Sequence, residues 1–187
     1  MVTHDGLVEE GWELYEEGEP SVAMEAFTDA RGLKPDSAEA AYGVASCLMR
    51  MGRLEKALEA LKEVVQLSPD HALALGDLGQ IFGRQGKNAE AREALLRAVR
   101  LDPSSPDFCQ SLGCVCLNDG DPRAALEWFE KASALWPESA DAWYMAAKAR
   151  LTLGEMTEAR AAIQRAAELA PDDDGVLELL SRLTASE

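Results

Sequence analysis

The chain has 187 residues, of which 47% are hydrophobic and only 6% aromatic, so an intrinsically disordered protein is excluded. Its 34 acidic residues against 18 Lys and Arg give a net charge of −16, which disfavours binding to nucleic acids and to anionic membranes. This acidity favours a basic partner, or it serves only to keep the chain soluble.

The N-terminal residues MVTHD lack the basic and apolar regions of a signal peptide. No apolar run along the chain approaches the ~20 residues that a membrane-spanning helix needs. We therefore expect a cytoplasmic protein that does not insert directly into a membrane.

Two residue types recur along the chain with a period of 34. They are the prolines and glycines Pro35, Pro69, Pro103, Pro137 and Pro171, and Gly18, Gly52, Gly86, Gly120 and Gly154. A fixed period between 20 and 50 residues indicates a repeat architecture. Because Pro stops a helix and Gly adopts the tight turn after one, each repeat is predicted to hold two helices. Helix A ends near the Gly, and helix B ends near the Pro.

The predicted repeats follow one another without a linker. In chain order they are residues 4–37, 38–71, 72–105, 106–139 and 140–173, a single solenoid over residues 4–171. A bulky side chain in each helix B is predicted to fill the core. These side chains are Phe27, Leu61, Leu95, Phe129 and Ile163. Each lies four residues after an Ala that lets the two helices approach closely.

The two ends of the predicted solenoid differ. Residues 174–187 are predicted to form a C-terminal capping helix. Its predicted buried face is Leu177, Leu180 and Leu183, and its predicted solvent face is Glu178, Arg182 and Glu187. The N-terminal end has no such cap. A second chain is therefore one way to cover Leu7, Val8 and Leu14, which leaves a homo-oligomer open.

Helix A of the third repeat reads Leu75-x2-Leu78-Gly79-x2-Phe82, and that of the fourth reads Cys109-x2-Leu112-Gly113-x2-Cys116. These spacings resemble the tetratricopeptide repeat (TPR) family, whose units favour W-x2-L-G-x2-Y, then A-x3-F-x2-A, then P. The resemblance implies an all-α, right-handed α-solenoid of five helix-turn-helix repeats. It also implies a scaffold without catalytic activity that binds a peptide or helix of a partner protein in a concave groove lined by helices A.

The groove positions of the family, carried onto this sequence, give the candidate peptide-binding residues. They are Trp12, Tyr15, Tyr42, Met49, Arg50, Gly76, Gln80, Gly83, Arg84, Leu117, Tyr144, Lys148 and Leu151. Aromatic anchors carry much of the energy of interfaces, which favours an apolar partner, and the acidity of the chain favours a basic one. Gly76 and Gly83 lie inside a helix, where Gly costs roughly 0.5–1 kcal/mol relative to Ala. This cost predicts either close approach of a ligand in the middle repeat or tight contact between helices.

Motifs of catalysis and metal binding are missing from the sequence. There is no GxSxG, P-loop or HExxH motif. The four cysteines, Cys47, Cys109, Cys114 and Cys116, lack zinc-site spacing and are predicted to be reduced. We expect no cofactor, no metal and no enzymatic activity. Two other functions stay open: a chaperone for a secreted or membrane-inserting client, as in the TPR chaperones of type III secretion, and a self-assembling structural scaffold.

Overall fold

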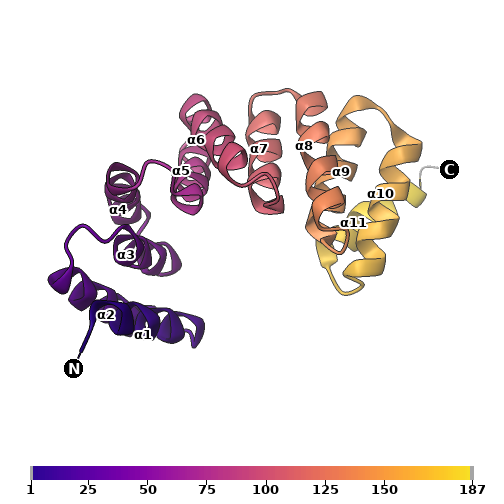
Figure 1. Ribbon diagram of the computed structural model, residues 1–187. Helices are drawn as coiled ribbons and strands as arrows, with labels where there is room; N and C mark the ends of the chain where they lie inside the picture. Colours follow the sequence, from indigo (N-terminus) through magenta and orange to yellow (C-terminus); the bar gives the residue numbers. More distant parts are fainter. Residues whose placement is uncertain (1, 186–187) are drawn as a thin grey trace. The chain divides into compact units, whose positions relative to one another are not determined.

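The computed structural model describes residues 2–185, and every regular element within that range is an α-helix (Figure 1). The helices in chain order are α1 (His4–Glu16), α2 (Pro20–Leu33), α3 (Ala38–Arg50), α4 (Leu54–Leu67), α5 (Ala72–Arg84), α6 (Asn88–Leu101), α7 (Pro106–Asn118), α8 (Pro122–Leu135), α9 (Ala140–Leu153), α10 (Met156–Leu169) and α11 (Asp174–Thr184). Each pair from α1 to α10 falls inside one predicted repeat, as helix A followed by helix B. The all-α helical-repeat fold is therefore confirmed.

The chain divides into two compact units. The first runs to Ile81, and the second begins at Phe82, so the division lies inside α5. Within the first unit, α1 packs on α2 and α3, α2 on α3, and α3 on α4. Within the second unit, each helix from α6 to α11 packs on the next one along the chain.

The turns inside the repeats have the predicted chemistry. All five periodic glycines have a positive φ, between 71° and 91°. Within residues 2–185, no residue other than these five has one. Each lies two residues after the end of its helix A, except Gly154, which directly follows α9. Each helix B ends two residues before its periodic Pro. These glycines and prolines therefore set the helix boundaries.

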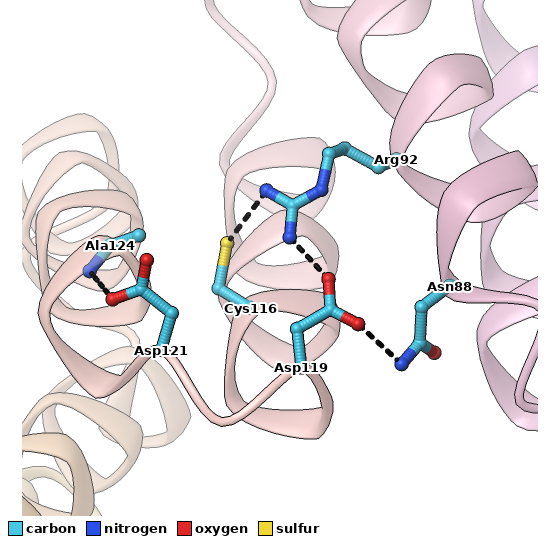
Figure 2. Close-up of polar contacts among 6 residues, drawn as sticks. All are labelled: Asn88, Arg92, Cys116, Asp119, Asp121 and Ala124. Carbon is cyan, nitrogen blue, oxygen red and sulfur yellow. Dashed lines mark hydrogen bonds and ion pairs between the residues drawn. The ribbon is translucent and has the colours of Figure 1, made fainter.

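Polar side chains cap the starts of several helices. The Ser37 hydroxyl accepts a hydrogen bond from the Ala40 N–H at 3.2 Å, at the start of α3. Asp121 Oδ1 accepts one from the Ala124 N–H at 3.0 Å, at the start of α8 (Figure 2). Such a cap satisfies an N–H group that has no partner within the helix.

The bulky series of helix B lies in the core, as predicted. All of its members are 0% exposed: Phe27, Leu61, Leu95, Phe129 and Ile163. The two Phe rings also need glycine in helix A. A Cβ added to Gly11 would lie 2.7 Å from the Phe27 ring, and one added to Gly43 would lie 2.4 Å from it. Gly113 has the same relation to Phe129, at 2.4 Å.

The helix α11 packs on α10, but its buried face differs from the predicted one. Val176, Leu179 and Leu183 are buried, whereas Leu177 is 40% exposed. The prediction was therefore wrong for Leu177, because the stripe toward α10 begins one residue earlier, at Val176. Leu180 is half-buried at the edge of this stripe.

The predicted solvent face of α11 agrees with the structure where it is described. Glu178 and Arg182 are exposed, and Glu187 lies outside the described residues. The side chain of Asp173 caps α11 by accepting from the Val176 N–H at 2.8 Å.

The N-terminal helix is covered within its own unit. Val8 is only 4% exposed, in a cluster with Ala23 and Phe27, and Leu7 and Leu14 pack on the same cluster. Val8 therefore needs no second chain to cover it, because α2 and α3 already do so.

Candidate peptide-binding site

The first unit contains an open pocket of about 660 Å³ formed by successive helices A. Its lining residues are Trp12 and Tyr15 of α1, Ala38, Glu39, Tyr42 and Ser46 of α3, Leu73 of α5, and His71 just before α5. Three of the residues predicted for peptide binding, Trp12, Tyr15 and Tyr42, are thus brought together. Each is half-buried, so each has an exposed part that a ligand can contact.

The aromatic rings of the pocket support one another. The Trp12 ring lies 5.7 Å from that of Tyr15 in an edge contact and 6.0 Å from that of Tyr42. Beneath them, Trp12 packs edge-on against the buried Phe27 ring at 4.9 Å. Edge and tilted contacts of this kind are the favoured geometries of aromatic pairs. The core of the first repeat therefore holds the Trp12 ring in place.

Tyr42 is fixed from α5 by a hydrogen bond. Its hydroxyl donates to Asp77 Oδ2 at 3.0 Å. Burial raises the pKa of Asp77 to about 6, although the bond from Tyr42 acts in the opposite direction. Burial, together with the charge of Asp77 and this bond, also raises the pKa of Tyr42. The phenol therefore stays protonated and donates throughout the neutral range.

His71 has a structural role at the rim of the pocket. Its Nδ1 accepts a hydrogen bond from the Ala74 N–H at 3.2 Å, so it caps α5, and its ring lies 4.6 Å from that of Tyr42. Burial lowers the pKa of His71, and the nearby Glu39 opposes this shift only in part. The imidazole is therefore neutral at pH 7.

Arg50 contacts the pocket from the end of α3. Its guanidinium carbon lies 4.7 Å from the centre of the Tyr15 ring, and its Nη1 donates to the Tyr15 carbonyl. This is a cation–π contact between consecutive helices A. Arg50 is one of the candidate peptide-binding residues, and in the structure its guanidinium also supports Tyr15.

The candidate set chosen from the sequence omits several residues of the site. Ala38, Glu39, Ser46, His71 and Leu73 line the pocket but are absent from the predicted set. Glu39, Ser46 and Leu73 occupy groove positions of the tetratricopeptide repeat family but were not chosen as candidates, whereas Ala38 lies beside Glu39 at the start of α3. His71 lies outside the helix, and its position near Pro69 gave no signal of a pocket.

Predicted residues on helices A of the second unit pack against its core. Tyr144 and Leu151 contact the cluster that α9 and α10 form with α11, and Leu117 contacts the cluster around Phe129. Lys148 is exposed, with its Nζ 5.2 Å from the centre of the Tyr144 ring. Their half-buried rings and side chains keep some accessible surface.

The predicted residues of the middle repeat are divided between the two units. Gly76 is buried, so it leaves no open surface, and Gln80 is half-buried. A Cβ added to Gly83 would lie 3.6 Å from Val115 Cγ2, which is ordinary contact between helices. Arg84 is exposed in the last turn of α5, and in the first unit Met49 of α3 is half-buried.

A second polar cluster lies in the second unit, where Arg92 of α6 reaches the end of α7 (Figure 2). Its Nη1 donates to Cys116 Sγ at 3.5 Å and its Nη2 to Asp119, which also accepts from Asn88 Nδ2 at 2.7 Å. The bonds from Arg92 and Asn88 lower the pKa of Asp119. These bonds join two consecutive repeats. Burial raises the pKa of the Cys116 thiol, so the cluster does not activate it as a nucleophile.

Residues 2–185 contain neither a metal-binding cluster nor a membrane-spanning helix. No group of His, Cys, Asp and Glu side chains in that range is arranged to hold a metal ion. Over the same range, each helix is too short or too polar to cross a bilayer. All four cysteines are free thiols, and Cys47, Cys109 and Cys116 are buried.

Comparison with known proteins gives matches of sequence and of fold. Two tetratricopeptide repeat models match residues 36–104 and 112–174. No curated protein sequence matches the chain. A structure described under the functional characterization of Pseudomonas aeruginosa pilF is similar over 98% of this chain and 83% of its own, with 23% identity and a TM-score of 0.89.

Two further solved structures are similar at a TM-score of 0.74. One is MamA, with 26% identity over 85% of this chain and 93% of its own. The other is YrrB, described as a TPR protein with an unusual peptide-binding site, with 20% identity over 92% of this chain and 89% of its own. Together with the period, the turn glycines and the buried helix B series, these matches identify the protein as a helical-repeat scaffold for protein interactions. The chain belongs to the tetratricopeptide repeat family.

Proposed function

We propose that the chain binds a peptide segment of a partner protein through the aromatic pocket of its first unit and performs no chemistry itself. The observation that carries the proposal is the convergence of Trp12, Tyr15 and Tyr42 on one open pocket. Aromatic side chains in a pocket are where binding energy concentrates at protein interfaces. The second unit supplies the remaining repeats and the terminal helix α11.

The pocket is ordered before any ligand enters. Trp12 is held against Phe27, and Tyr42 is held by Asp77. Binding therefore spends little free energy on fixing these side chains, which favours affinity for a short segment. Leu73 adds a 52% exposed apolar surface at the start of α5. A peptide with both an apolar and a polar side chain suits such a lining.

Selection from a phage-displayed peptide library on the intact chain tests this function. Peptides that enrich are synthesised and titrated by calorimetry into the parent protein and into Trp12→Ala and Leu73→Ser. We expect Trp12→Ala to weaken binding at least tenfold, as for a buried aromatic anchor. Leu73→Ser changes an exposed side chain, so it should weaken binding severalfold without loss of folding.

The matched control is Trp136→Ala, because Trp136 is 51% exposed and lies outside the pocket. It should leave the dissociation constant unchanged. Circular dichroism of each variant establishes that the helices are intact. Failure of every library peptide to bind would contradict the proposal, and so would peptides whose affinity is the same for the parent, Trp12→Ala and Leu73→Ser.

A further inference from the structure

Within residues 2–185, two carboxylates, Glu39 and Asp77, outnumber the one cation that contacts the pocket, Arg50 over Tyr15, so the charges around the pocket suit a positively charged ligand. Of its eight lining side chains, Glu39 is the one that carries a full charge at pH 7 in the described part of the chain. Glu39 is exposed, so its carboxylate is accessible at the rim. His71 adds no positive charge there, because burial lowers its pKa and its Nδ1 is used as an acceptor.

A second carboxylate lies behind the pocket wall. Asp77 accepts the hydrogen bond of Tyr42 at 3.0 Å, and among residues 2–185 no Lys, Arg or His forms an ion pair with it. A phenol that donates to a carboxylate has a more electron-rich ring. Such a ring attracts a cation to its face more strongly, since cation–π attraction follows the negative potential of the ring face.

The chain itself shows that one aromatic ring of this pocket, that of Tyr15, accepts a guanidinium group. Arg50 lies over Tyr15 at 4.7 Å and also donates to its carbonyl. With Tyr15 contacted in this way, Trp12 and Tyr42 are the rings left for an incoming cation. A guanidinium is planar and weakly hydrated, so it stacks on a ring while its N–H groups still bond a carboxylate. A Lys ammonium is more strongly hydrated and lacks this flat fork.

The net charge of the first unit is negative, which suits a positively charged ligand. Residues 1–81 contain 16 Asp and Glu against 6 Lys and Arg, a net charge of −10, whereas residues 82–187 contain 18 against 12, a net charge of −6. A unit with this excess of negative charge attracts cationic segments and speeds their association.

We propose that the pocket of the first unit binds an arginine side chain of the partner peptide. Its guanidinium lies against the rings of Trp12 and Tyr42, and its N–H groups donate to the carboxylate of Glu39. This inference rests on the proposed function and adds the chemistry of the residue that is recognised.

Two small probes that differ in charge test the proposal on the intact protein labelled with ¹⁵N. N-acetyl-arginine amide and the neutral, nearly isosteric N-acetyl-citrulline amide are titrated while the indole N–H signals are followed by NMR. We expect the Trp12 signal to shift saturably with the arginine probe and at least tenfold more weakly with the citrulline probe. The signal of the exposed Trp136 should not move. Equal responses to both probes, or no shift of Trp12 up to the solubility limit, would overturn the inference.

A substitution at the rim separates the carboxylate from the rings. Glu39→Gln changes an exposed side chain and should weaken the arginine probe about three- to fivefold, the loss expected for an accessible ion pair. It should leave the citrulline probe unchanged. Glu9→Gln, an exposed change on α1 outside the lining, is the matched control and should affect neither probe. An unchanged affinity of Glu39→Gln for the arginine probe would contradict the assigned contact.

The library peptides distinguish failure of this inference from failure of the proposed function. Peptides that need Trp12 but bind equally well with arginine replaced by citrulline would overturn the arginine site and leave the peptide-binding function standing. Absence of any binding peptide, while the arginine probe still shifts the Trp12 signal, would overturn the peptide-binding function and leave the arginine site standing.

Discussion

Replacing Asp77 with Asn should stabilise the first unit at neutral pH. Burial raises the pKa of this carboxyl from its ordinary 3.8 to about 6. Because the folded pKa lies above the unfolded one, the folded state holds the proton more tightly. The contribution of Asp77 to stability is therefore complete below pH 3.8 and is lost as the pH rises through about 6. Asn keeps an acceptor oxygen for the Tyr42 hydroxyl but cannot ionise.

The size of the effect follows from the difference between the two pKa values. About two units at 1.36 kcal/mol each give an upper limit of about 3 kcal/mol at pH 7.5 and about 1 kcal/mol at pH 4.5. Partial access of water to Asp77 reduces the gain, so we expect Asp77→Asn to add about 1–3 kcal/mol at pH 7.5.

Urea unfolding followed by circular dichroism at the two pH values measures the gain, with hydrogen exchange of α3 and α5 as the local readout. The control is Asp29→Asn, which makes the same chemical change at an exposed position of α2 in the same unit. It should alter stability by less than about 0.5 kcal/mol at either pH. An Asp77→Asn protein that is less stable than the parent at pH 7.5, or a gain equal at both pH values, would refute the reasoning.

Two pairs of substitutions test the packing of the repeats. Gly43→Ala should lower the free energy of unfolding by about 1–3 kcal/mol, because its Cβ would lie 2.4 Å from the Phe27 ring. A Cβ added to Gly32 of α2 would meet open space, so Gly32→Ala should raise the free energy of unfolding by about 0.5–1 kcal/mol. Urea unfolding measures the effect of both substitutions. In α11, Leu179→Ala should destabilise the last repeat by about 2–5 kcal/mol, whereas Leu177→Ala should cost less than about 0.5 kcal/mol. Hydrogen exchange in α10 and α11 that responds equally to both changes would contradict the observed register.

The architecture could be predicted from the sequence because each boundary depends on a local rule. Gly18 and its equivalents need a left-handed conformation, and Pro35 and its equivalents cannot continue a helix. These constraints act on single residues and repeat every 34 positions. The buried helix B series followed from the same period, since equivalent positions face equivalent neighbours.

The register of α11 was harder to predict because several of its faces contain leucine. Leu177, Leu180 and Leu183 fit one helical stripe, and Val176, Leu179 and Leu183 fit the neighbouring stripe equally well. Packing on α10 decides between them, and that choice depends on the angle between two helices. A pattern in one helix contains no information on this angle.

The geometry of the pocket depends on contacts between repeats. Tyr42 and Asp77 are 35 residues apart, one more than the period, so they occupy different positions in consecutive helices A. A pattern that compares equivalent positions therefore cannot pair them. The cap of α5 was similarly hidden, because the hydrogen bond is accepted by a ring nitrogen of His71 and not by a Ser, Thr, Asp or Asn side chain. Both contacts depend on side-chain directions that only the packed helices define.

Asp77 links the stability of the first unit to its binding. Burial disfavours the ionised form of the Asp77 carboxyl. A cation that approaches the ring of Tyr42, the hydrogen-bond donor to Asp77, favours the ionised form again. Binding of the arginine probe should therefore be stronger at pH 7.5 than at pH 5, where Asp77 is mostly protonated. Asp77→Asn removes the carboxylate contribution and should weaken the probe at pH 7.5 while it stabilises the fold. A variant that gains stability and also binds the arginine probe more tightly would show that Asp77 plays no part in recognition.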